Sequence, residues 1–261
     1  ALYGAMASAT INGKPFRDYV FLANEGTIIQ AHKYRDMFPL MRDAGLRAVW
    51  FGVEDLSEEL VKKGQKPWKT KEVFNSMVQN GISPMPMLMH FDGQPLRTDD
   101  GLEGLLNQVE FLGKHGAASM QVTINMPSIG SKDYERHFKN GTVLKRVGDM
   151  TAGWNLYDGN HAVSTSGDPL EKERNIRSAY ELYYGWKNRI KAGLDYIRSK
   201  LNGDKATKDI AYVALLWQMW GFEGLRISRE NMRQWQRNLA TRVYEYWDDV
   251  PKSQIPIVSV E

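Results

Sequence analysis

The chain has 261 residues, a formal net charge of +3 and no cysteine. Its length is sufficient for one large or two small domains with a hydrophobic core. The absence of cysteine excludes disulfides, a thiol nucleophile, a cysteine zinc site and any iron–sulfur cluster held by thiolates of this chain. The mild charge gives no reason to expect a nucleic-acid partner.

No segment approaches the roughly 20 apolar residues that a membrane-spanning helix needs. The nearest, Ile210 to Phe222, is too short and predicts a buried helix. Residues 1–17 lack the basic-then-apolar layout of a secretory signal. We interpret them as a linker, or as the ragged start of a piece cut from a longer chain, and we expect a cytoplasmic location.

Apolar runs alternate with amphipathic segments through the first half, which is typical of βα units around a parallel sheet. The expected strands are residues 18–23, 46–54, 82–93 and 117–127, with a weaker candidate at 26–33. The expected helices are residues 33–45, a segment starting at Leu56 with Ser57 as N-cap, 69–81 and 98–116. A period of roughly 35 residues fits either a βα barrel or a doubly wound sheet.

The alternation of expected strands and helices ends after Pro127. Residues 128–167 are rich in turn signals, and the rest of the chain is predicted to be helical over 168–201, 206–221 and 228–248, with Asp168 as the first N-cap. The resulting division is a linker (1–17), a partial βα barrel (18–130), an irregular segment (131–167) and a helical C-terminal region (168–261).

Three segments in order carry a family resemblance: AGLRAVWFGVEDLSEELVKKGQK, GISPMPMLMHFDGQPLRT and TINMPSIGSKDYERHFKNG. WNLYDGNHAV and the aromatic segment SAYELYYGW extend it. Over roughly residues 35–190 the chain resembles the C-terminal portion of a radical S-adenosylmethionine (SAM) enzyme, of the branch that has an N-terminal cobalamin-binding domain. The order and spacing of the segments carry the resemblance, since no single motif is specific.

The resemblance implies an α/β fold, a partial parallel (β/α) barrel of radical SAM type followed by a mostly helical region. It also implies reductive cleavage of SAM at a [4Fe–4S] cluster, giving a 5′-deoxyadenosyl radical that abstracts hydrogen from a small-molecule substrate, often for methylation or ring rearrangement. The family's Cys-x-x-x-Cys-x-x-Cys motif and its cobalamin domain have no counterpart in this sequence. Both the cluster and cobalamin would come from a missing segment or a partner chain. We expect such a partner, or self-association, to complete the barrel.

The resemblance assigns SAM-binding roles to strand-end residues. Glu54 would accept hydrogen bonds from the ribose hydroxyls, and the other expected contacts are His90, Asp92, Gly93, Pro127 and Gly130. Simpler explanations stay open for each position. Glu54 and Asp55 could favour the N-terminus of a following helix, His90 and Asp92 could be a solvated loop pair, and Pro127 and Gly130 could form an ordinary turn.

Two further assignments concern the second half. Tyr157, Asp158 and His161 could do acid–base work, although YDGN is also a plain turn signal. The C-terminal segment LRISRENMRQWQRNLATRVYEYW could contact a membrane peripherally through Trp and Arg, or simply form a helical cap with a charged face. The histidines lack a metal-site spacing, so no metal site is predicted.

Two other functions remain open from the sequence. A cluster-less, degenerate radical-SAM-like scaffold would act as a structural or assembly subunit. A barrel enzyme using Glu54 and Asp92 as acid and base is supported only by their strand-end positions.

Overall fold

The computed structural model describes residues 1–61, 64, 66–91, 93–124, 134–147, 150–151, 171–241 and 243–249. The chain forms two compact units. Unit 1 comprises Ala1–Met89, Gln94–Val122 and Ser178–Leu225, and unit 2 comprises His90–Gly93, Thr123–Arg177 and Arg226–Glu261.

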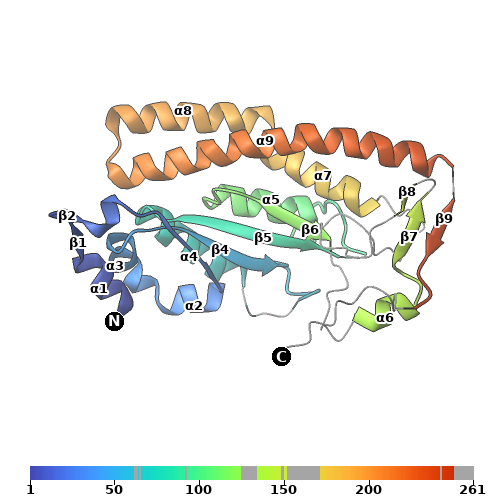
Figure 1. Ribbon diagram of the computed structural model, residues 1–261, viewed down its shortest axis with the longest axis horizontal. Helices are drawn as coiled ribbons and strands as arrows, with labels where there is room; N and C mark the ends of the chain where they lie inside the picture. The colour runs from blue at the N-terminus through green and yellow to red at the C-terminus, as the bar shows by residue number, and fades with distance from the viewer. Residues whose placement is uncertain are drawn as a thin grey trace. The chain divides into compact units, whose positions relative to one another are not determined.

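A parallel sheet of four strands is the central feature of the α/β fold (Figure 1). Its strands are β3 (Leu22–Gly26), β4 (Leu46–Glu54), β5 (Ser83–His90) and β6 (Gln121–Ile124), paired in the order β3-β4-β5-β6. A doubly wound sheet reverses its strand order at a switch point, and this order contains no reversal. Among the described strands none joins β6 back to β3, so these four form an open sheet.

The two central strands are where the apolar runs predicted them. β4 coincides with the expected 46–54, and its Leu46, Ala48, Phe51 and Val53 side chains are buried. Burial on both faces explains a near-continuous apolar run, as parallel strands covered by helices require.

Two helices cover this sheet with apolar faces. In α4 (Pro67–Gln79) the side chains of Val73, Phe74 and Met77 are fully buried, and the Phe74 ring lies 5.7 Å from that of Phe51 on β4. In α5 (Leu105–Lys114) the buried residues are Leu105, Gln108, Val109 and Leu112. Burying each large apolar side chain contributes roughly 1.5–3 kcal/mol, so these faces hold the helices in place.

The N-terminal segment differs from the expectation at two points. It contains α1 (Leu2–Ser8), β1 (Thr10–Ile11), β2 (Lys14–Pro15), the 3₁₀ turns η1 (Phe16–Asp18) and η2 (Arg35–Met37), α2 (Ile28–Lys33) and α3 (Phe38–Asp43). The strand expected at 18–23 begins only at Leu22, because Asp18 belongs to η1 and Tyr19 to the turn that ends it. The weak strand expected at 26–33 is the helix α2, because Thr27 accepts a hydrogen bond from the Gln30 N–H and caps it.

Two predicted helix starts are also wrong. No helix follows Leu56 in the described residues up to Val61, where the Asp55 carboxylate takes up the Ser57 and Leu60 N–H groups. The helix expected at 98–116 begins at Leu105, because the Asn107 side chain holds Thr98 N–H and C=O in a loop. Side chains thus bind the backbone groups that a helix would have used.

The C-terminal helices are divided differently from the expectation. α7 (Glu171–Tyr183) and α8 (Trp186–Asn202) replace one long helix, and Asn188 donates to the Leu182 and Tyr183 carbonyls at the break. α9 (Lys205–Leu239) replaces two helices. Its Gly221 does not break the helix, because it lies against Tyr184, whose ring a Cβ at this position would meet at 2.2 Å.

In unit 1, α8 and the first part of α9 lie antiparallel, side by side (Figure 1). The Tyr196 and Tyr212 rings are 6.1 Å apart, and the Arg189 guanidinium lies 3.5 Å from the centre of the Phe222 ring. Asp209 on α9 binds Arg42 and lies 3.7 Å from the buried Arg47, which fastens α9 beside the sheet.

In unit 1, three tyrosines bind backbone groups along the outer edge of β6 and of the residues that lead into it. The Tyr184 hydroxyl accepts from Met120 N–H at 2.8 Å and donates to Met120 C=O at 2.9 Å. Tyr180 makes the same pair of bonds to Val122, at 3.0 and 2.9 Å, and Tyr183 donates to the Ala117 carbonyl. Side-chain hydroxyls therefore occupy backbone groups that another strand would need at this edge.

Unit 2 contains α6 (Tyr134–Lys139) and a three-stranded antiparallel sheet in the order β8-β7-β9. The strands are β7 (Leu144–Val147), β8 (Met150–Thr151) and β9 (Tyr244–Tyr246), and Phe138, Val143 and Leu144 are buried beside them. Across the parts of the chain that the structure describes, no helix combines the length and apolar character needed to cross a membrane.

Candidate functional site

The end of β4 has an unusual backbone at the residue that sequence analysis selected first. Glu54 has φ +61°, and the Asp55 N–H donates to the Val53 carbonyl at 2.7 Å. A hydrogen bond from residue i+2 to residue i around a positive-φ centre is a γ-turn of the rare, strained kind. The register with β5 also shifts between Gly52 and Glu54. Such strain in a non-glycine residue clusters at functional sites.

Gly52 leaves room for the Glu54 side chain. A Cβ at position 52 would lie 2.8 Å from Glu54 Oε1, so the carboxylate folds back over the glycine. Glu54 is half-buried and belongs to a central strand of the sheet, at its carboxyl end. Parallel βα folds bind ligands at that end of their strands.

The next residue, Asp55, is fully buried and held by hydrogen bonds. Its carboxylate accepts from Ser57 N–H at 3.1 Å, from the Ser57 hydroxyl at 2.7 and 2.8 Å, and from Leu60 N–H at 3.0 Å. Gln108 on α5 donates to it at 2.7 Å and accepts from Leu56 N–H at 2.9 Å. Asp55 and Gln108 therefore fix the loop that follows Glu54.

The electrostatics of Asp55 agree with a structural role as an anion. Burial alone raises the pKa of this carboxyl group, but the hydrogen bonds from Ser57, Leu60 and Gln108 outweigh it, and the net result is a lowered pKa. A carboxylate with several donors stays ionised at neutral pH. Asp55 is therefore a fixed acceptor and a poor general acid.

His90 ends β5 and is buried in unit 2. Its Nε2 lies 3.0 Å from Nδ2 of Asn175 on α7. An amide nitrogen donates, so with this amide orientation Nε2 is the acceptor. A buried, oriented histidine contradicts the simple explanation of a solvated loop pair at this position.

Gly93, the remaining described member of the predicted set, is exposed and has φ +75°. That conformation favours glycine and gives a turn after β5. Asp92, Pro127, Gly130, Tyr157, Asp158 and His161 lie outside the described residues. Of the predicted SAM-binding residues, the described ones are therefore Glu54 in unit 1 and His90 and Gly93 in unit 2.

Sequence reasoning missed the supporting residues Gln108 and Asn175, and it considered Asp55 only in the alternative in which Glu54 and Asp55 favour the N-terminus of a following helix. Gln108 lies among apolar positions of α5 that are buried, which was a readable signal of a buried polar contact. Asn175 is 85 positions from its partner His90, so no local pattern could indicate it.

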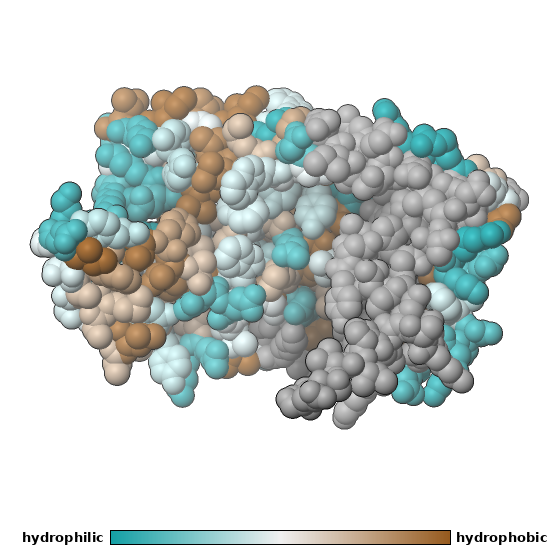
Figure 2. All heavy atoms as spheres, in the orientation of Figure 1, coloured by the Kyte–Doolittle hydropathy of each residue, from teal (hydrophilic) through white to brown (hydrophobic). Residues whose placement is uncertain are grey.

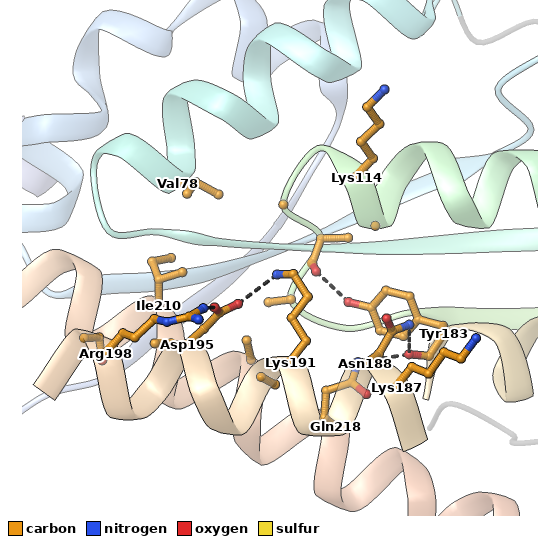
Figure 3. A pocket seen from close by; sticks show the side chains of 18 of the residues that line it. Val78, Lys114, Tyr183, Lys187, Asn188, Lys191, Asp195, Arg198, Ile210 and Gln218 are labelled. Atoms are coloured by element: carbon orange, nitrogen blue, oxygen red, sulfur yellow. Dashed lines mark hydrogen bonds and ion pairs between the residues drawn. The ribbon is translucent and has the colours of Figure 1, made fainter. Parts of the chain in front are cut away.

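A large open cleft of about 1300 Å³ lies elsewhere in unit 1 (Figure 3). It lies among the C-terminal end of α5, the residues leading into β6, and helices α8 and α9. Lys191 and Arg198 project into it and pair with Asp195 at 2.8 and 3.4 Å. The cleft borders the amino end of β6, the opposite end from the one where βα folds bind ligands. We therefore place the candidate site at Glu54 and not at this cleft.

Within the described residues, no three His, Asp or Glu side chains are grouped closely enough to hold a metal ion. Compared with known proteins, the sequence matches no protein-family model, and no curated protein matches it at a significant level.

Proposed function

We propose that this chain supplies part of the SAM-binding wall of a radical-SAM-type (β/α) barrel, with Glu54 accepting hydrogen bonds from the ribose hydroxyls. The observation that carries the proposal is the strained γ-turn that presents the Glu54 carboxylate at the carboxyl end of β4. The sequential strand order supports it, because a barrel needs neighbouring strands to follow one another along the chain.

The residues of this chain do not fit a [4Fe–4S] cluster, since it has no cysteine to supply a thiolate. The cluster, and cobalamin with it, would belong to another polypeptide or segment that carries the first half of the barrel. SAM, when bound, supplies the adenosyl group of the family's radical chemistry. This chain would contribute the orientation of the ribose through Glu54 and a wall for the small-molecule substrate.

The experiment is isothermal titration calorimetry, in which SAM is titrated into the purified chain and its affinity is measured. Glu54→Gln keeps the size of the side chain but removes its charge. Hydrogen bonds to a charged group contribute about 1.5–3 kcal/mol, so we expect affinity to fall roughly 10- to 100-fold.

Glu59→Gln is the matched control, because Glu59 is an exposed glutamate in the loop that follows the same strand. It should leave the affinity unchanged. Absence of SAM binding by the wild-type chain, or equal affinities of the wild type and Glu54→Gln, would overturn the proposal.

The second candidate is a cluster-less scaffold with a structural or assembly role. The complete absence of cysteine favours it, because such a chain cannot start the radical chemistry by itself. The same titration separates the two candidates, since a scaffold does not need to bind SAM. A partner that carries three cysteines and restores iron binding to the complex would favour the first.

A further inference from the structure

One face of helix α8 is apolar and faces outward. Its five members are exposed to between 47% and 76%: Trp186, Ile190, Leu194, Ile197 and Leu201. At 100° per residue they fall within an arc of about 80° along the whole 17-residue helix. In Figure 2 a row of hydrophobic side chains runs along the top edge, where Figure 1 places α8.

The opposite side of α8 holds it to the rest of unit 1. Ala192 and Ser199 are buried, and Asn188 donates to the Leu182 and Tyr183 carbonyls. The polar residues Lys191 and Asp195 lie toward the cleft (Figure 3). A helix that only packed on its own domain would place its apolar stripe inward. In α8 the apolar stripe is instead exposed, so it is available to contact another surface.

Positive charge borders the stripe on both sides. By the same helical geometry the exposed Lys187, Lys191 and Arg198 follow one border and the exposed Lys200 follows the other, whereas Arg189 packs its guanidinium on Phe222 of α9. Asp195 is the helix's single acidic residue, so α8 carries five basic residues against one, a net charge of +4. Trp186 stands at the first position, and the Lys187 ammonium lies 5.8 Å from its ring.

We propose that α8 is a membrane-surface helix that lies flat on an anionic lipid bilayer and inserts these five apolar side chains at the headgroup boundary. An apolar stripe with lysine and arginine borders and a terminal tryptophan is the pattern of interfacial helices, in which basic side chains reach anionic headgroups. The positive charge of α8 also argues against a second copy of the chain as the binding partner of this face. A two-fold contact through this face would set one +4 helix against another.

The test is co-sedimentation of the full chain with vesicles of mixed phosphatidylglycerol and phosphatidylcholine, and with vesicles of phosphatidylcholine alone. We expect binding to the anionic vesicles that is at least tenfold stronger and that weakens as salt is raised, because the basic borders are screened. Leu194→Glu should reduce the anionic-vesicle affinity at least tenfold.

Ile29→Glu is the matched control: Ile29 lies on α2 and is 47% exposed, the same fraction as Leu194. It should not change vesicle binding, and circular dichroism checks that both variants are folded. Failure to bind anionic vesicles, equal binding to both vesicle types, or equal loss in the two variants would overturn the proposal. A dimer in light scattering that Leu194→Glu abolishes, without vesicle binding, would identify a second copy as the occupant instead.

Discussion

Two neighbouring acidic residues at the end of β4 have different roles. Glu54 sits in a strained turn with its carboxylate folded over Gly52, whereas Asp55 is buried and binds donors from its own loop and from α5. The hydrogen bonds of Asp55 and Gln108 hold the loop in one conformation. A strained residue such as Glu54 persists only where its surroundings fix it in this way. Asp55 is therefore a positioning residue for Glu54.

Asp55→Asn should lower the free energy of unfolding by about 2 kcal/mol at pH 7, because an amide nitrogen replaces an acceptor that faces N–H donors. The folded-state pKa of Asp55 is lowered. Its stabilising contribution is therefore present above the unfolded pKa of about 3.9 and is lost as pH falls through the folded value. The difference in the free energy of unfolding between the wild type and Asp55→Asn should therefore become smaller below about pH 4.

Urea denaturation at pH 7 and pH 3.5 measures this difference, with the exposed Asp99→Asn as the control that should change little. If wild type and Asp55→Asn differ by the same free energy of unfolding at both pH values, the charge of Asp55 is not what stabilises the loop.

At the scale of elements, the tyrosines of α7 and of the turn after it take the place of a neighbouring strand. Tyr180 and Tyr184 each satisfy one N–H and one C=O of β6 or of the residues leading into it, two positions apart along one edge. The same hydrogen bonds therefore hold the end of α7 against the sheet and cover the backbone groups at this edge. Their hydroxyls stay protonated, because burial raises the pKa of Tyr180, Tyr183 and Tyr184.

Tyr184→Phe should lower the free energy of unfolding by about 1–2 kcal/mol, since it leaves Met120 N–H and C=O buried without this partner. Denaturation in urea checks the size, and the exposed Tyr212→Phe should be nearly neutral. Because the folded pKa is raised, the stabilising contribution is complete below the unfolded value of about 10 and declines at higher pH. A loss no larger than that of the control would contradict the edge-capping role.

The elements that sequence reasoning identified correctly are those with a strong apolar pattern, such as β4, β5 and α4. The errors fall where distant side chains decide the local structure. Gln108 completes the loop at Asp55 from 53 positions away, and Gly221 stays helical because Tyr184 packs on it. For the site, the resemblance and the strand-end position together pointed to Glu54, whose role stays a prediction, and the turn geometry and its supporting network depend on tertiary contacts that the sequence does not display.

At the scale of the whole molecule, the two edges of the parallel sheet differ. The outer edge of β6 is occupied by tyrosine hydroxyls, while among the described strands β3 pairs with β4 alone. Three of the five residues of β3 are exposed. If another segment extends the barrel, β3 is the edge to which it can add.

We therefore expect the isolated chain to self-associate through β3 or to form a complex with a polypeptide that carries the first barrel strands. Size-exclusion chromatography with light scattering over a dilution series measures this, and running Leu194→Glu in parallel removes any contribution of α8. A monodisperse monomer that unfolds cooperatively at all concentrations would contradict the expectation.

The tyrosine-covered strand also limits the size of an assembly that forms through the parallel sheet. A sheet with two free edges can accept one neighbour on each side and propagate into a filament. Among the described strands of the parallel sheet, β3 alone has an edge without such a cover, so two chains that met along β3 would use the free parallel-sheet edge of each. Assembly through the sheet would stop at a pair, and a complex with a complementary half would have a fixed one-to-one stoichiometry.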